Sequence, residues 1–174
     1  MEIGSAMGRA VRCACALALV LACRSGAEAR VTSRAHGTRV RVDAHAIRIM
    51  DGDTAEITWS PAERETVRVL GIDAPELFER GSGRDTRTIP GFEARGFARG
   101  AFATAREITL LRATMMDGYG RTLGYFFLDG RNYSVLALES GMARETISRF
   151  GDNGFPEEAA RVMEAARSRR FRRR

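Results

Sequence analysis

The sequence predicts an α+β fold, in which five strands close into a small barrel and three helices pack around it. The chain has 174 residues, of which 44% are apolar, so it is long enough for one domain with a substantial core. Its expected strands come as a group of three and then as a pair, with one helix between the groups and two helices after the pair. This order matches the OB-fold, a five-stranded Greek-key barrel.

The group of three strands begins the predicted domain. Apolar and polar residues alternate from Val40 to Ala46 and the phase then slips at Ile47, which predicts a strand with a bulge or a bend. A second strand is expected from Thr54 to Trp59, and Pro61 separates it from a third strand, Thr66 to Ile72. Three consecutive strands of this kind form a meander, the usual start of a small closed barrel.

A long loop and a helix separate this meander from the pair of strands. Residues 77–90 are rich in glycine, arginine and threonine and predict a loop. From Ala94 to Ala105 apolar residues recur at helical spacing, which indicates an amphipathic helix with one face on the core. The two strands are expected at Ile108 to Thr114 and at Thr122 to Leu128.

Two further helices are expected after the strands. Asn132 is suited to cap a short helix that Gly141 ends. Pro156 opens the last helix, whose apolar stripe runs from Ala159 to Ala166.

The excess positive charge is concentrated at the C-terminus. The formal net charge is +6, and all 28 basic residues are arginine. Residues 167–174 hold six arginines and no acid, whereas residues 30–166 hold 19 arginines and 20 acids. Such a tail is typical either of a protein with an anionic partner or of a disordered, solvated end.

The N-terminus has the pattern of a secretory signal. Two arginines precede an apolar run from Cys13 to Cys23, which is too short to span a bilayer as a helix. Ala27-Glu28-Ala29 then offers a small-x-small cleavage site, so we expect a secreted or periplasmic chain that begins at Arg30. The alternative is a lipoprotein anchored to a membrane at Cys23, because Val20-Leu21-Ala22-Cys23 resembles a lipoprotein signal, although less closely.

These boundaries divide the chain into four expected parts. They are a signal peptide at 1–29, a linker at 30–37, the barrel domain at 38–166 and the arginine-rich tail at 167–174. All three cysteines lie in the signal peptide, so the mature domain is expected to have no disulfide.

Acidic residues in two short segments point to a site for a hard cation. Asp53 lies in Asp51-Gly52-Asp53-Thr54, and Asp73 and Glu76 lie in Ile72-Asp73-Ala74-Pro75-Glu76, directly after a strand. Calcium takes several oxygen ligands from carboxylates, main-chain carbonyls and water. The alternatives are a simple hairpin turn at the Asp-Gly pair and a solvated acidic loop around Pro75.

Two arginines near these acids are candidates for binding a phosphate. Arg68 lies in an apolar run, where an unpaired charge is costly to bury, so it either binds a ligand or pairs with an acid such as Asp53 or Glu76. Arg121 follows Asp117-Gly118-Tyr119-Gly120, and its alternative is an exposed arginine at the edge of a strand. The planar fork of arginine suits bidentate contacts with phosphate.

In order, content and spacing, these three segments resemble the staphylococcal nuclease (thermonuclease) family, which hydrolyses phosphodiesters in DNA and RNA with calcium. The likeness extends from about Thr38 to about Phe150 and, less closely, through the last helix, and it implies the barrel fold with three helices. It implies that Asp53 and Asp73 bind calcium directly and that Ala74 lends its main-chain oxygen. It also implies that Asp51 is an outer acid that holds metal-bound water and that Glu76 activates the attacking water.

The same resemblance implies that Arg68 and Arg121 clamp the phosphate and that Tyr119 lies near it. The sequence departs from the family where two tyrosines that pack on the nucleotide are replaced by Ile147 and Arg149. This departure bears on base preference and affinity, and it leaves the chemistry in place.

We therefore expect a secreted, calcium-dependent nuclease that cuts DNA and RNA as a monomer without a stable protein partner. One alternative is a non-catalytic OB-fold module that binds nucleic acid, and another is a calcium-stabilised surface protein. The retained acids, the nearly neutral body and the scarcity of stacking aromatics favour the nuclease over the binding module.

Overall fold

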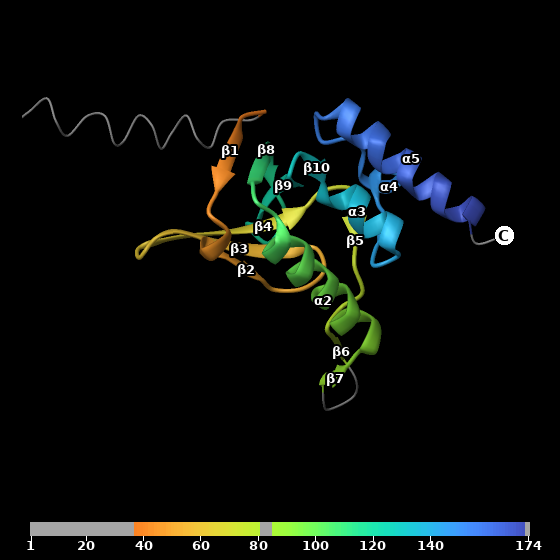
Figure 1. The fold of residues 1–174 in the computed structure, drawn as a ribbon, viewed down its shortest axis with the longest axis horizontal. Helices are drawn as coiled ribbons and strands as arrows, with labels where there is room; N and C mark the ends of the chain where they lie inside the picture. The colour runs from red at the N-terminus through yellow and green to blue at the C-terminus, as the bar shows by residue number, and fades with distance from the viewer. Residues whose placement is uncertain (1–36, 81–84, 173–174) are drawn as a thin grey trace, which may run out of the picture. The chain divides into compact units, whose positions relative to one another are not determined.

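Residues 37–80 and 85–172 are described by a computed structural model of the chain (Figure 1). The expected signal peptide, the linker up to its last residue and the last two arginines of the tail lie outside the described residues, and they stay predictions. Among the residues that the structure describes, no helix is long and apolar enough to cross a membrane.

The main sheet closes into the expected barrel. Its strand order is β1-β8-β9-β4-β3-β2, and β4 pairs with β9 in parallel while the other neighbours are antiparallel. Because β1 and β2 are consecutive parts of one bent strand, the chain occupies both edges of the sheet and closes it. This is the five-stranded OB-fold in an α+β protein, which confirms the predicted fold class. The strands are β1 (Arg39–Val42), β2 (Ile47–Ile49), β3 (Thr54–Ser60), β4 (Glu63–Val69), β8 (Ile108–Met116) and β9 (Thr122–Leu128).

The bend predicted in the first strand is a short 3₁₀ turn, η1 (Ala44–Ala46). The Asp43 side chain accepts a hydrogen bond from the His45 amide at 2.9 Å, which favours the turn over a continuous strand. The chain thereby changes direction between β1 and β2, as barrel closure requires.

The three expected helices are present, and a fourth, α4 (Ile147–Phe150), is added. α2 (Ile89–Thr104) begins after the N-cap Thr88 and buries a stripe against the core, Ala94, Ala98 and Phe102. α3 (Tyr133–Ser140) runs from its cap Asn132 to Gly141, whose φ of 83° ends it. α5 (Pro156–Arg172) packs against α3 (Figure 1).

Two local predictions were wrong. The expected loop at 77–90 contains a hairpin of β6 (Phe78–Arg80) and β7 (Asp85–Arg87), and α2 begins within it. The expected third strand is interrupted at Gly71, whose φ of 80° suits glycine and not a strand residue. The chain then forms β5 (Ile72–Asp73), which pairs with β11 (Arg144–Glu145) outside the main sheet.

The expected arginine tail is largely helical. α5 continues to Arg172, so residues 167–172 do not form a disordered end. The Arg169 guanidinium donates to the carbonyl oxygens of Gly141 and Ala143 at 3.4 and 3.5 Å, after the end of α3. Removing the chain after Ala166 would therefore disturb packing as well as charge.

One ion pair is buried in the barrel between β4 and β8. Arg112 donates to both carboxylate oxygens of Glu65, at 2.8 and 2.7 Å, and Thr122 and Trp59 donate to the same carboxylate. Burial alone would raise the pKa of Glu65, but the Arg112 guanidinium and these hydrogen bonds outweigh it and hold the pKa below its ordinary value.

We expect Glu65→Gln to lower the free energy of unfolding by about 1.5–3 kcal/mol at neutral pH, because it removes the charge from this network. The folded pKa lies below the unfolded value, so the carboxylate stabilises the fold above the ordinary pKa of 4.5. That stabilisation is lost as the pH falls through the folded pKa, and the difference from wild type should shrink there. Urea unfolding at several pH values measures it. Glu139→Gln, which breaks an exposed pair with Arg131, is the control, and an equal loss in both variants would contradict the prediction.

Candidate functional site

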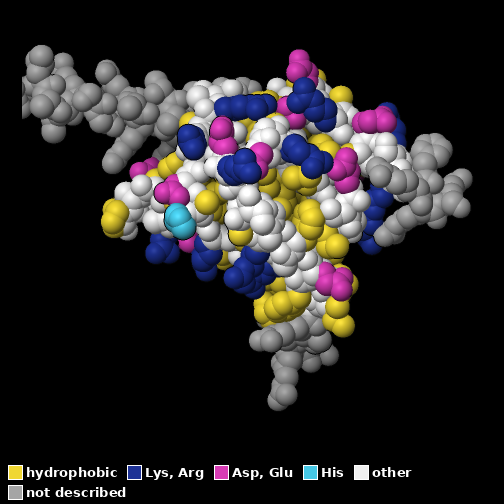
Figure 2. All heavy atoms as spheres, viewed as in Figure 1, with side chains coloured by type: hydrophobic (Ala, Val, Ile, Leu, Met, Phe, Trp, Pro, Cys, Tyr) yellow, Lys and Arg dark blue, Asp and Glu magenta, His cyan; other side chains and the backbone are white. Residues whose placement is uncertain are grey.

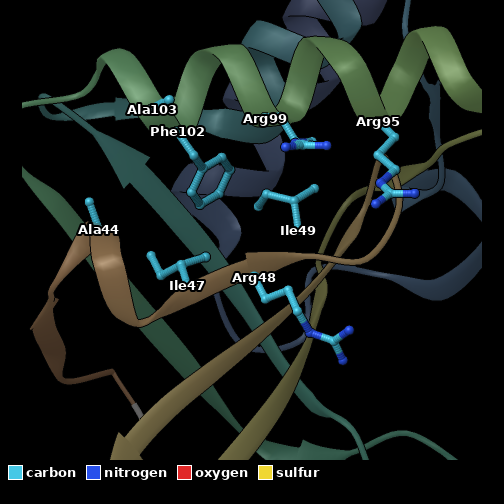
Figure 3. A pocket seen from close by; sticks show the side chains of 8 residues that line it. All are labelled: Ala44, Ile47, Arg48, Ile49, Arg95, Arg99, Phe102 and Ala103. Carbon is cyan, nitrogen blue, oxygen red and sulfur yellow. The ribbon is translucent and has the colours of Figure 1, made fainter.

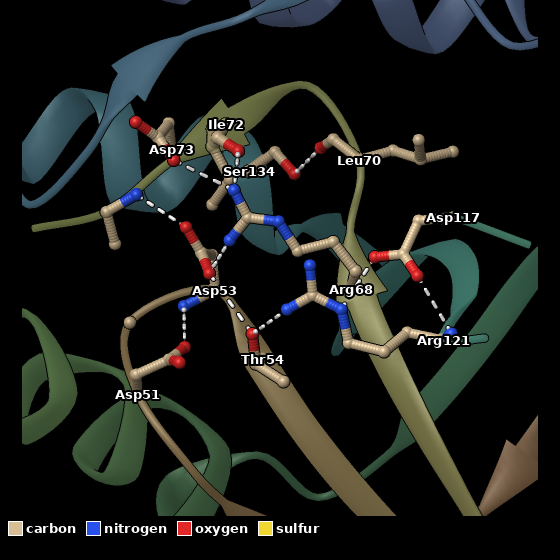
Figure 4. Close-up of polar contacts among 12 residues, drawn as sticks. Asp51, Asp53, Thr54, Arg68, Leu70, Ile72, Asp73, Asp117, Arg121 and Ser134 are labelled. Carbon is tan, nitrogen blue, oxygen red and sulfur yellow. Dashed lines mark hydrogen bonds and ion pairs between the residues drawn. The ribbon is translucent and has the colours of Figure 1, made fainter. Parts of the chain in front are cut away.

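The candidate site lies where the ends of β3, β4, β5 and β9 meet (Figure 4). The sheet register pairs Thr54 with Arg68 across β3 and β4, and Arg68 with Leu123 across β4 and β9. Residues that directly precede β3 and β9 are thereby brought beside Arg68. Segments separated by more than fifty positions in the sequence meet at this end of the barrel.

Asp53 is the buried acid of the site, with 4% of its surface exposed. One carboxylate oxygen accepts a hydrogen bond from the Ala74 amide at 2.5 Å, and the other contacts the Arg68 guanidinium and the Thr54 hydroxyl. Its main-chain oxygen accepts from the Val69 amide at 2.8 Å. The carboxylate is thus fixed by three segments of the chain.

Arg68 holds two carboxylates with one guanidinium. Besides Asp53 it contacts the Asp73 carboxylate at 2.9 Å, and it donates to the Ile72 carbonyl oxygen at 3.5 Å. The ion pair with Asp53, which the sequence left open as one alternative for Arg68, is therefore present. Among residues 37–80 and 85–172, no ion pair joins Arg68 to Glu76.

The turn that carries Asp51 connects β2 to β3 and borders the candidate site. The Asp51 carboxylate accepts from the Asp53 amide at 3.0 Å, and burial raises its pKa above the ordinary value despite the opposing effects of Thr54, Arg68 and Arg121. Glycine is required at Gly52, because a Cβ there would collide with Ala74 and Ala94. The Asp51 carboxylate thus fixes the main chain of Asp53.

Arg121 is oriented by an acid of its own turn. The Asp117 carboxylate accepts from the Arg121 Nε at 2.6 Å and from the main-chain amides of Tyr119 and Arg121 at 2.9 Å. Burial alone would raise the pKa of Asp117, but these hydrogen bonds lower it below its ordinary value. Arg121 also donates to Thr54 at 3.4 Å, which connects it to Asp53. The ring of Tyr119 is exposed, and its centroid lies 5.5 Å from the Arg121 guanidinium carbon.

Glu76 lies three residues beyond Asp73 with its side chain exposed to solvent. Its main chain is anchored instead, because the Thr88 hydroxyl donates to the Glu76 carbonyl oxygen and the Thr88 amide donates to that of Leu77. Within the described part of the chain, its carboxylate takes part in no hydrogen bond or ion pair. The structure thus anchors the backbone of Glu76 to the start of α2 and leaves its side chain exposed.

The donor set suits a cation that accepts water and main-chain ligands. Two carboxylate oxygens, one from Asp53 and one from Asp73, converge on a single positive group, and the Ala74 peptide adjoins them. In the two stretches that the structure describes, no three histidine, cysteine or acidic side chains are grouped closely enough to hold a metal by themselves. Any cation held by Asp53 and Asp73 would therefore need main-chain carbonyls or water as further ligands, and calcium accepts both.

The sequence prediction missed three residues that position the site. Asp117 holds the Arg121 guanidinium, and its spacing of four residues before the arginine was the available signal. Thr88 anchors Glu76 from the start of α2. Tyr133 donates to the Gly52 carbonyl oxygen at 2.7 Å, and no local pattern pairs residues so far apart in sequence.

Comparison with known proteins adds a family match. The model of a family described as staphylococcal nuclease homologue matches residues 66–172. A thermonuclease of Staphylococcus intermedius is 31% identical over 109 residues, which cover 62% of each chain. An SPbeta prophage-derived endonuclease of Bacillus subtilis is 30% identical over 105 residues, covering 59% of this chain and 34% of its own. An uncharacterized protein of Methanocaldococcus jannaschii is 28% identical over 134 residues, covering 63% and 64%. The chain spans less than two thirds of the length of these relatives.

Proposed function

The chain belongs to the staphylococcal nuclease family, and on this premise we propose that it is a calcium-dependent nuclease that hydrolyses phosphodiester bonds in DNA and RNA. The observation that carries the proposal is the group formed by Asp53, Asp73, Arg68 and Arg121. Glu76, three residues after Asp73, adds an exposed acid. Acids that hold a cation and arginines that hold a phosphate are what such a hydrolysis requires.

In this proposal Asp53, Asp73 and the Ala74 carbonyl would hold calcium, and Asp51 would support the water around it. When bound, the ion would supply positive charge that polarises the phosphate.

The other residues act on the phosphate and on the attacking water. Arg68 and Arg121 donate to the phosphoryl oxygens, where fixed donors count most as negative charge develops. Asp117 keeps the Arg121 guanidinium in place for this. Glu76 accepts the proton of the water that attacks phosphorus in line with the leaving oxygen. Tyr119 borders the phosphate beside Arg121.

Calcium should be required for cleavage. We expect no nicking of plasmid DNA after treatment with chelator, full recovery on adding calcium, and turnover at least about tenfold lower in magnesium alone, because magnesium demands a strict octahedron and gives up water reluctantly. The assay uses the full domain and follows supercoiled and nicked plasmid on a gel.

The same assay distinguishes the alternatives. A binding module would retard the plasmid without nicking it, and a calcium-stabilised surface protein would do neither. Equal turnover with magnesium after chelation would refute the calcium requirement and leave the nuclease proposal standing.

We also propose that the chain is exported and that it works as a monomer. Export rests on the arginines, the apolar run and the small-x-small pattern of residues 9–29.

A further inference from the structure

A second basic feature lies outside the candidate site, between α2 and β2 (Figure 3). It is a cavity of about 350 Å³ whose lining combines three arginines with an apolar floor. The arginines are Arg48, Arg95 and Arg99, and the floor is formed by Ala44, Ile47, Ile49, Phe102 and Ala103. On the face shown in Figure 2, arginine side chains gather beside β2.

Arg95 and Arg99 form the charged side of the cavity. They are one helical turn apart on α2, and in Figure 3 both side chains project from the helix toward β2. Two like charges at this spacing destabilise a helix. Within residues 37–80 and 85–172, neither side chain has a hydrogen bond or an ion pair that would offset this repulsion.

The Nε atom of Arg95 is the sharpest indication of a ligand. It is buried and has no hydrogen-bond partner among the described residues. A buried donor left without a partner costs free energy, and a bound anion would remove that cost. Arg48 differs, because its Nε donates to Glu56 at 3.3 Å and its side chain extends away from the helix in Figure 3. Arg95 and Arg99 are therefore the two guanidinium groups available to an anion.

Residues that line the cavity are close in sequence to residues of the candidate site. Ile49, which forms part of its floor, is two residues before Asp51, and Ala94, which precedes Arg95, packs against Gly52. The turn of residues 50–53 therefore links a strand that lines the cavity to the acids of the candidate site. The apolar floor beneath the two guanidinium groups suits a ligand unit with one phosphate and one flat or aliphatic part.

We propose that this cavity binds a nucleotide unit of a single nucleic acid strand outside the position that is cut, with its phosphate on Arg95 and Arg99 and its sugar or base on Ile47, Ile49 and Phe102. The proposal rests on the proposed nuclease function for the identity of the ligand. It adds a positioning contact that lies away from the reacting phosphate, and it concentrates two of the basic groups of a nearly neutral body in one place.

The test compares Arg95→Gln/Arg99→Gln with Arg41→Gln/Arg131→Gln, which removes two exposed arginines that do not line the cavity. Binding of fluorescent oligothymidine is measured in chelator over a range of salt, with strands of about 4 and about 16 nucleotides, the limits of what one OB-fold covers. Because chelator is present, the readout does not depend on cleavage, and a failure of the nuclease proposal would be seen separately.

We expect the cavity variant to bind the longer strand about tenfold more weakly than the control and to flatten its salt slope by about 0.7–1.4, as loss of one or two phosphate contacts predicts. The shorter strand should lose less. Affinity and salt slope equal to those of the control would overturn the proposal. So would equal losses for both strand lengths, since that points to damage at the candidate site. Binding of thymidine monophosphate is measured with the same two variants. If the cavity variant loses this binding but still binds the strands, the cavity binds free nucleotides, and the proposal is overturned as well.

Discussion

Glu76→Gln should lower the turnover of nucleic acid by about 10²–10⁴-fold, which is the usual contribution of a general base. Glutamine keeps the size and polarity of the side chain but cannot accept the proton of the attacking water. The fold should be unaffected, because what the structure anchors at this position is the main chain, through Thr88, and the carboxylate is exposed. Steady-state cleavage at saturating calcium and substrate measures the loss, with thermal unfolding alongside it.

Glu93→Gln is the matched control for this substitution. Glu93 is also an exposed acid, and it lies on α2 close to the helix start that anchors Glu76. The Glu93→Gln variant should cleave as wild type does, because Glu93 lies on α2 outside the group of acids and arginines at the candidate site. A Glu76→Gln variant within a few-fold of wild type would remove Glu76 from its proposed role as the base.

Arg68→Lys should lower turnover by about 10²–10³-fold, the usual cost of removing one donor that stabilises developing negative charge. The substitution keeps the positive charge, so the expected loss tests geometry. Asp53 and Asp73 hold the planar guanidinium in one orientation, so its donors would meet the phosphate as a fixed fork that the point charge of lysine cannot reproduce. Turnover should fall more than the Michaelis constant rises, because the contact with phosphate tightens in the transition state.

Arg64→Lys controls for the general effect of this exchange in the same strand. Arg64 is exposed and pairs only loosely with Glu56, at 3.6 Å, so its replacement should leave turnover unchanged. Urea unfolding of both variants separates lost chemistry from lost stability. If Arg68→Lys turned over substrate at the wild-type rate, Arg68 would be a structural partner of Asp53 and not a phosphate ligand.

Sequence patterns predicted the elements that are repetitive and missed those that are short. The alternation in 54–59 and 122–128 and the helical stripe from Ala94 are long enough to be distinctive, and all three elements are present. The hairpin of β6 and β7 has three residues on each side, and β5 and β11 have two each. Strands this short cannot show a recognisable alternation of apolar and polar residues. Their positions depend on the strands with which they pair.

By itself, the sequence determined the order of strands and helices, the turns at Asp-Gly and Gly141, and the residue types that a metal and a phosphate would need. These follow from local preferences, which act over a few residues. Only the tertiary structure decided that Arg68 bridges Asp53 and Asp73 and that Asp117 orients Arg121. It also decided that the Nε atom of Arg95, on the wall of a cavity, has no hydrogen-bond partner among the described residues. The register between β3, β4 and β9 and the packing of α2 on β2 bring those groups together, and no periodicity encodes contacts between residues so far apart along the chain.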